Sequence, residues 1–343
     1  MVAFLRLTRP LNLLIIVFTM IAMRYGVIQG YLEVSSAELQ SMTTAPQQTI
    51  FTQVPGNAFA HAFTDRLFWL LLLSTVLIAA GGNVINDYFD TRIDRVNRPD
   101  TVIVGRSVKR RVAMMGHLIL TGIGVLVGAF VAWRSGQLHL VSLSVFAAGS
   151  LWYYSTKFKR TFLLGNGLVA LLVALVPLSV GLYEIPALLM TYGSHATGTL
   201  PNGDHVEIIF GFHGLWAWIL GFAGFAFLTT LVRELQKDMA DLKGDKADGC
   251  RTVPIVLGVK WAKAITLLYL ALVIIALLLV RSVALRDQFS YWYIGAGIVV
   301  PLLLSAGFTY QANSRQGFNT AGNILKVAMA IAIAFAFFIR YTL

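Results

Sequence analysis

The stretch NVINDYFDTRIDRVNRPD, residues 83–100, decides the fold because of the segment that precedes it. It follows directly on LFWLLLLSTVLIAAGG, residues 67–82, an apolar run typical of a membrane-spanning helix. Eighteen residues therefore carry four carboxylates and three arginines at the end of a hydrophobic segment. Charges beside hydrocarbon are poorly solvated, so we expect these acids to bind something cationic.

The composition is that of an integral membrane protein. The 343 residues are 57% hydrophobic and 13% charged, with a mean hydropathy of +0.73, whereas about a quarter of the residues are charged in soluble domains. The single cysteine, Cys250, excludes an internal disulfide. The formal net charge of +11 is typical of basic loops on one membrane face, so we expect no nucleic-acid partner.

Apolar runs of spanning length predict an all-α, polytopic membrane protein with about nine transmembrane helices. The predicted spans are 11–29, 67–87, 112–133, 137–155, 163–183, 212–232, 263–281, 291–309 and 322–340. We interpret residues 1–343 as a single transmembrane domain. The first apolar run lacks a small-residue cleavage site and is interpreted as a retained span.

Lysine and arginine predict the orientation of the spans. With the N-terminus taken as inside, the inner loops hold 20 of the 27 basic residues. The positive-inside rule then places the N-terminus in the cytoplasm and the C-terminus outside a bacterial-type inner or plasma membrane. Residues 30–66 and 184–211 become long outer loops without a helical or strand period. Residues 88–111 and 233–262 become cytoplasmic active-site loops.

A second acid-rich segment, RELQKDMADLKGDKADG at residues 233–249, resembles the first in position. The two segments hold nine of the sixteen acids of the chain, on the same predicted membrane face. One follows the second span and the other the sixth. This repetition predicts two pseudo-repeated four-helix halves plus one further helix.

The spacing of the acids predicts a divalent-metal site. If each span continues as a helix, Asn86, Asp90 and Asp94 share one face, and Asp238, Asp241 and Asp245 share another. Interleaved arginines could neutralise these acids. Hard oxygen ligands on two segments, however, suit Mg²⁺, which takes few carboxylates and completes its shell with water and substrate phosphate. Two such clusters would hold a diphosphate through bridging metal ions. Nearby lysine and arginine side chains would then neutralise the remaining negative charge of the phosphates.

These residues resemble the UbiA superfamily of intramembrane prenyltransferases. The first segment matches the motif N-D-x-x-D-x-x-x-D from Asn86 to Asp94, followed by NRP at 97–99. The second matches D-x-x-x-D at Asp241 and Asp245, within REL-x-KD and GD-x-x-x-G-x-RTVP-x-x-LG. Lesser matches are RP-x-N at residues 9–12 and YS-x-x-x-KR at 154–160. One departure is VIVGRSVKRR, where many members carry a proline-rich loop.

The resemblance implies Mg²⁺-dependent transfer of a prenyl group from an isoprenyl diphosphate to a lipophilic or amphipathic acceptor within the membrane. It implies catalytic roles for Asp87, Asp90 and Asp241. The expected diphosphate-binding residues are Lys159 first, then Arg98, Arg106 and Arg160, together with Asn12 and Tyr154. Membrane lipids are the expected surroundings, and no obligate protein partner is inferred.

The pattern is most similar to the branch that adds geranylgeranyl to geranylgeranylglyceryl phosphate. Prenylation of an aromatic quinone precursor is the alternative reaction, because those branches share similar metal motifs. Two other classes stay open on the residues alone. A cation-coupled secondary transporter would use the acids for its ion, but these acids gather at the inner span ends rather than mid-span. A structural or assembly protein with ion-paired loops is the other.

Overall fold

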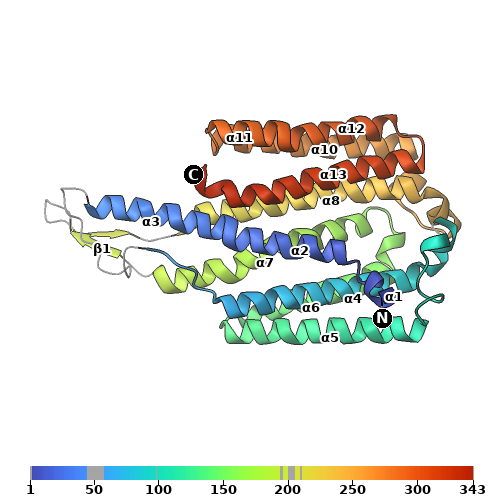
Figure 1. The fold of residues 1–343 in the computed structure, drawn as a ribbon, viewed down its shortest axis with the longest axis horizontal. Coiled ribbons are helices and arrows are strands. Elements are labelled where there is room, and N and C mark those ends of the chain that lie inside the picture. Colours follow the sequence, from blue (N-terminus) through green and yellow to red (C-terminus); the bar gives the residue numbers. More distant parts are fainter. Residues whose placement is uncertain are drawn as a thin grey trace.

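A computed structural model describes residues 2–44, 58–97, 99–193, 196–199, 205–208 and 211–342. Its helices run side by side along one axis (Figure 1). The first half of the chain comprises α1 Val2–Leu7, α2 Pro10–Ile21, the π-helical η1 Ala22–Ile28, α3 Gln29–Thr44, α4 Asp65–Asn97, η3 Pro99–Thr101, α5 Arg110–Arg134, η4 Leu138–Leu140, α6 Val141–Thr156 and η5 Phe158–Arg160. The second half comprises α7 Leu164–Tyr192, β1 Ala196–Thr199, β2 His205–Ile208, α8 His213–Ala247, α9 Val253–Val256, α10 Val259–Val283, α11 Gln288–Trp292, η6 Tyr293–Val299, α12 Val300–Gln311, α13 Arg315–Phe335 and η7 Ala336–Tyr341.

The prediction of a helical membrane protein is confirmed. Within the described residues, eight helical stretches are long and apolar enough to cross a membrane. Helix α6 is apolar but shorter, with 16 residues, and overlaps the predicted span 137–155. With it, the described residues hold a helix at each of the nine predicted spans. The N-terminus lies at the end of the bundle where α4 gives way to η3, and the C-terminus lies toward the other end (Figure 1).

The predicted outer loops contain more regular structure than their sequence indicated. The first span continues without a break through η1 into α3, so residues 30–44 are helical. Helix α7 extends to Tyr192, and β1 pairs antiparallel with β2, with Ala196 opposite Ile208. A helix that already has its first turn adds each further residue at little cost. This is why the weakly periodic residues beyond each span stay helical.

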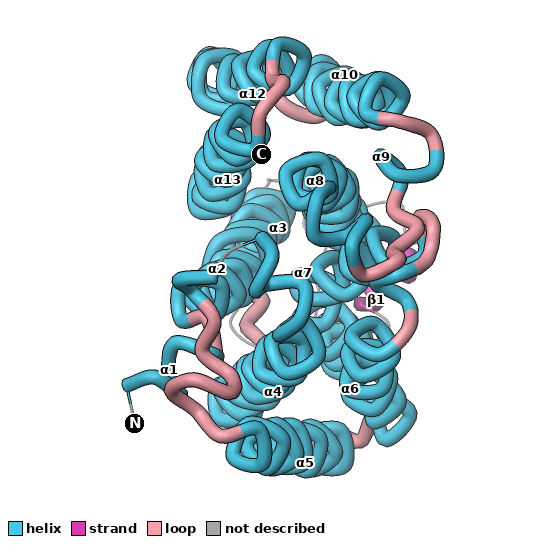
Figure 2. The backbone as a smooth tube through the Cα atoms, turned by 90° about the vertical axis from the view of Figure 1, so that its right-hand side faces the viewer, coloured by secondary structure: helices cyan, strands magenta, loops and turns pink. Residues whose placement is uncertain are grey.

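The helices form a ring with an outer layer. Viewed along the helix axes, α5 lies at one edge of the molecule, and α10 and α12 lie at the opposite edge (Figure 2). Helix α5 packs against α4 and α6, and α10 packs against α8 and α12. Helices α2, α4, α6, α7, α8 and α13 surround the space between these layers.

The main apolar core fills the end of the bundle that is remote from the acid-rich segments. It joins η1, the start of α4, the end of α7, the start of α8 and the end of α13. Close backbone contact helps to pack it: a Cβ on Gly26 would lie 2.7 Å from the carbonyl carbon of Ala336. This solid end leaves the opposite half of the ring free to enclose a cavity.

A buried ion-pair network ties this core together. The fully buried Arg24 guanidinium donates to Glu184 Oε2 at 2.8 Å, to Asp65 Oδ1 at 2.8 Å and to the carbonyl oxygen of Phe63 at 2.7 Å. Glu184 Oε1 accepts from the backbone N–H of Ala62 at 2.7 Å. One arginine thus connects η1, α4 and α7 to the segment that precedes α4.

We predict that Arg24→Met destabilises the protein by about 3–5 kcal/mol, because it leaves Glu184 buried without its counter-charge. The measurement is the thermal unfolding midpoint of the purified protein in detergent. Arg134→Met, at an exposed arginine near the end of α5, is the control and should leave the midpoint nearly unchanged. Equal midpoints for the two variants would contradict a stabilising role for the network.

Candidate active site

The two acid-bearing helix ends meet, as the sequence predicted. Helix α4 continues to Asn97 and α8 to Ala247, so both acid-rich segments are helical. The Asn97 side chain joins them: its Nδ2 donates to the carbonyl oxygen of Asp241 at 3.2 Å, and its Oδ1 accepts from the backbone N–H of Gly244 at 3.0 Å. A Cβ on Gly244 would lie 2.3 Å from Asn97 Nδ2. Glycine therefore allows the close approach of α8 to α4.

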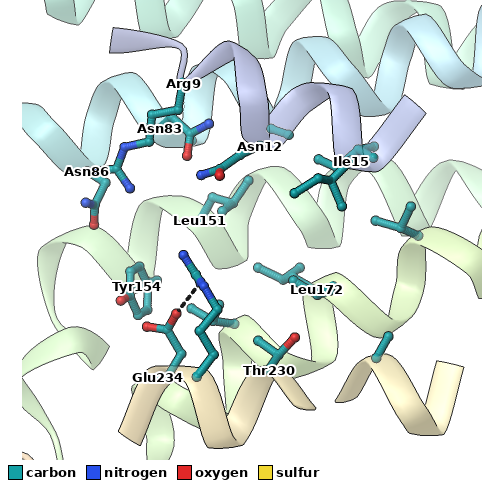
Figure 3. Close-up of a pocket in the computed structure, with 18 of the residues that line it drawn as sticks. Arg9, Asn12, Ile15, Asn83, Asn86, Leu151, Tyr154, Leu172, Thr230 and Glu234 are labelled. Carbon is teal, nitrogen blue, oxygen red and sulfur yellow. Dashed lines mark hydrogen bonds and ion pairs between the residues drawn. The ribbon is translucent and has the colours of Figure 1, made fainter. Parts of the chain in front are cut away.

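The six predicted aspartates line one cavity of about 760 Å³. They are Asp87, Asp90 and Asp94 on α4, and Asp238, Asp241 and Asp245 on α8. The rest of the cavity lies between α2, α6, α7 and α13 and is lined largely by apolar side chains such as Ile15, Leu151 and Leu172 (Figure 3). The cavity thus combines a charged end with an apolar body.

Asp90 accepts hydrogen bonds from two side chains at the charged end of the cavity. Its Oδ2 accepts from Asn86 Nδ2 at 2.7 Å, and Lys159 Nζ donates to the same oxygen. Asp90 is buried, and so is most of the Lys159 side chain. Burial alone would lower the pKa of the Lys159 ammonium, but the Asp90 carboxylate raises it, and the net shift is upward. Lys159 is therefore a fixed cation at the charged end of the cavity.

Arg9 is a second fixed cation and was not among the predicted site residues. Its guanidinium donates to Asp87 Oδ1 at 2.5 Å. Burial lowers the pKa of Arg9, and the Asp87 carboxylate more than compensates. Arg9 adopts a left-handed backbone conformation, with φ of 54°, at the junction between α1 and α2. The RP-x-N match was the signal that could have identified it.

The acids on α8 are held by partners from three elements. Asn166 Nδ2 donates to Asp238 Oδ2 at 2.9 Å, and Arg315 at the start of α13 lies 3.3 Å from Asp241 Oδ1. Glu234, one turn before Asp238, pairs with Arg233 at 2.9 Å and with Lys237 at 3.5 Å. Glu234, Arg233 and Lys237 also line the cavity and were not predicted. Figure 3 shows Glu234 across the cavity from Asn83 and Asn86.

The carboxylate and amide oxygen atoms of the cavity fit a hard divalent cation that takes some of its ligands from the protein and the rest from the substrate. Across the described ranges, neither Asp94 nor Asp245 makes a hydrogen bond or ion pair through its carboxylate. The Oδ1 atom of Asn86 is buried without a hydrogen-bond partner. No group of three or more His, Cys, Asp or Glu side chains in the described part of the chain is close enough to form a complete metal cage. An ion here would need further oxygen atoms from water or phosphate.

The other predicted substrate contacts separate into two groups. Asn12, Tyr154 and Lys159 line the cavity. Arg160 pairs instead with Asp248 at 2.9 Å, and the exposed Arg106 donates to the carbonyl oxygen of Pro99 at 2.9 Å. Neither arginine lines the cavity, so their predicted contact with a diphosphate is not supported by their positions. Arg98 lies outside the described residues.

The sequence matches the profile of the UbiA prenyltransferase family over residues 50–339. This match covers most of the chain, including both aspartate segments.

The chain belongs to the UbiA prenyltransferase family.

It is therefore a membrane prenyltransferase, and the transporter and structural-protein alternatives are set aside. The digeranylgeranylglyceryl phosphate synthase of Methanothermobacter thermautotrophicus is 31% identical over 280 residues, which cover 80% of this chain and 86% of that protein. The synthase of the same name from Thermococcus sibiricus is 28% identical over 282 residues, which cover 80% and 86%.

Solved structures share the fold of this UbiA member. A UbiA homologue from Aeropyrum pernix K1 superimposes with a TM-score of 0.56 at 15% identity, over 92% of this chain and 97% of that one. A UbiA homologue from Archaeoglobus fulgidus bound to DMAPP and Mg²⁺ gives a TM-score of 0.53 at 16% identity, over 99% of both chains. At these identities the likeness confirms the arrangement of helices.

We predict that Gly244→Ala lowers prenyl transfer at least about tenfold, because the added methyl displaces Asn97 and separates the two acid segments. Gly221→Ala on the same helix is the matched control, because a Cβ there meets no atom within 4 Å. The control should retain its activity and gain up to about 1 kcal/mol of helix stability. The measurement is the initial rate of prenyl transfer by each variant. Equal rates would refute the role of the contact between Gly244 and Asn97.

Proposed function

We propose that the protein transfers a prenyl group from an isoprenyl diphosphate to the hydroxyl of a prenylated glyceryl phosphate, with Mg²⁺ as its cofactor. The observation that carries the proposal is the convergence of two aspartate-bearing helix ends and two partly buried cations on one cavity with an apolar body. The names of the relatives support the acceptor. An aromatic acceptor is the alternative.

The proposed metal-binding residues are Asn86, Asp90 and Asp94 on α4, with Asp238, Asp241 and Asp245 on α8. Mg²⁺, when bound, supplies positive charge that makes the diphosphate a better leaving group. Lys159 and Arg9 place two further cations beside the same acids. They would bind and orient phosphate oxygen atoms of the donor. Preorganised charge of this kind stabilises the negative charge that develops on the departing group.

The apolar body of the cavity accommodates the prenyl chain. Along α4, the lining residues run from Asp87 back to Leu71, which is about 24 Å of helix at 1.5 Å per residue. In the proposed reaction the bond between C1 of the donor and its bridging oxygen breaks and diphosphate leaves. The acceptor hydroxyl oxygen then bonds to C1 and transfers its proton to the departed diphosphate. The apolar walls keep water away from the allylic cation, which water would otherwise consume.

We also infer the orientation from charge. The loops at the acid-bearing end carry most of the lysine and arginine residues, which supports a cytoplasmic position for this end and for the N-terminus. The diphosphate, a water-soluble headgroup, would then enter from the cytoplasm.

We predict that Asp90→Asn and Asp241→Asn each lower transfer at least about 100-fold, because each removes a proposed metal ligand. Asp100→Asn is the matched control: Asp100 belongs to the same segment but is exposed and lies outside the cavity. Diphosphate release and product formation are measured with Mg²⁺ and a labelled prenyl diphosphate, with prenyl glyceryl phosphate and hydroxybenzoate as acceptors. Near-normal turnover in either aspartate variant would overturn the metal role. Turnover with hydroxybenzoate alone would replace the proposed acceptor.

We predict that Lys159→Met raises the KM for the donor about tenfold or more, because a charge-assisted hydrogen bond contributes about 1.5–3 kcal/mol. Its matched control is Lys157→Met, at an exposed lysine two residues earlier that does not line the cavity. Steady-state kinetics with the donor varied at saturating acceptor provide the measurement. A donor KM equal to that of the control would exclude Lys159 as a diphosphate contact.

A further inference from the structure

A lysine on the last membrane span lines the catalytic cavity, outside the acid clusters. Lys326 lies in the middle of α13, and its Nζ donates to Asn323 Oδ1 at 3.2 Å, one turn earlier on the same helix. Asn319, Asn323 and Lys326 all line the cavity. A charged side chain within a membrane span is costly and usually has a functional reason. None of the steps described above uses this one.

The packing of α13 on α8 gives the depth of Lys326. Arg315 lies beside Asp241, and a Cβ on Gly322 would lie 3.5 Å from Gln236 Oε1, so the two helices run antiparallel. Lys326 is one further turn along α13 and therefore lies level with residues near 232–233 of α8. Side chains of a helix point toward its N-terminus, which for α13 is the acid-bearing end. The hydrogen bond to Asn323 agrees with this direction.

Because the ammonium group is hydrogen-bonded to Asn323, which lies level with about residue 235 of α8, it is held at the inner edge of the acid clusters. This level is three residues, or about 4–5 Å of helical rise, to the membrane side of Asp238. A donor whose diphosphate occupies the acid-bearing end would place C1 at this edge, where its apolar chain begins. Any acceptor must bring its hydroxyl to the same level. Lys326 and the two asparagines on α13 therefore face the place where the acceptor headgroup has to lie.

An acceptor with its own phosphate needs a cation at this point. In a prenyl glyceryl phosphate, the carbon that bears the hydroxyl neighbours the carbon that bears the phosphate ester. The phosphate must therefore enter the cavity together with the reacting hydroxyl. Six aspartates nearby would repel it, and an unpaired anion is strongly disfavoured in a water-poor cavity. A lysine with flanking amide donors offsets both effects.

We propose that Lys326, supported by Asn323 and Asn319, binds the phosphate of the acceptor and so selects a phosphate-bearing lipid over a neutral alcohol. This inference rests on the proposed function and adds a second anion site, separate from the one that holds the donor diphosphate. A lysine that merely extends to lipid headgroups would not discriminate between acceptors.

Lys326→Met keeps the apolar stem and removes the charge, and Lys326→Arg keeps the charge. Each is assayed with the prenyl glyceryl phosphate and with the same lipid lacking its phosphate. We expect Lys326→Met to raise the KM for the phosphate acceptor about tenfold or more, with the donor KM within about twofold of wild type. Its activity toward the neutral alcohol should match wild type, and Lys326→Arg should recover most of the phosphate preference. Lys263→Met is the control: this α10 lysine contacts Tyr310 and Asn313 and lies outside the cavity.

The outcomes separate the two proposals. Wild-type protein that turns over neither acceptor would refute the proposed acceptor class itself. Wild-type protein that prefers the phosphate, with an unchanged preference in Lys326→Met, would refute the role of Lys326 alone. Should Lys326→Met fail to accumulate in detergent, Asn323→Leu tests the same site, and an unchanged acceptor KM in that variant counts against the proposal.

Discussion

The structure depends on holding like-charged carboxylates together at the edge of a membrane. Two helix ends, α4 and α8, bring six aspartates to one cavity, and such acids repel one another where water is scarce. Part of the repulsion is met by Arg9, Lys159 and Arg315, each within reach of one carboxylate. Asp94 and Asp245 feel these cations only at longer range and form no direct ion pair with another described residue, which leaves their carboxylates available to a divalent ion.

The remainder of the fold makes this arrangement possible. A solid apolar core and the buried Arg24 network fix one end of the bundle, so the other end can remain open around a cavity without loss of shape. Helices α5, α10 and α12 add an outer layer and leave the inner ring to carry the chemistry. Charge at one end and apolar walls along the rest match a donor that is itself a charged head on an apolar chain.

Much of this could be predicted from sequence because the informative signals are local. Hydropathy identifies the spans, and the helical spacing of Asp90 with Asp94 and of Asp241 with Asp245 identifies two faces that need a common ligand. The pairing of Arg24 with Glu184 could not be predicted, because the partners are 160 residues apart and one sequence carries no pairing signal. Lys159 and Arg160 are adjacent and carry the same charge, so the sequence does not distinguish them. In the short helix η5, Lys159 lines the cavity and Arg160 pairs with Asp248.

The central claim is that the two aspartate segments act as one site for a metal-bound diphosphate. A double-mutant cycle on binding tests it most directly, with a non-reactive prenyl thiolodiphosphate titrated in the presence and absence of Mg²⁺. We expect Mg²⁺ to tighten binding to the wild-type protein and Asp94→Asn or Asp245→Asn each to remove that gain. The double variant should then bind no more weakly than either single variant. Strictly additive losses, or affinity that does not depend on Mg²⁺, would contradict a shared site.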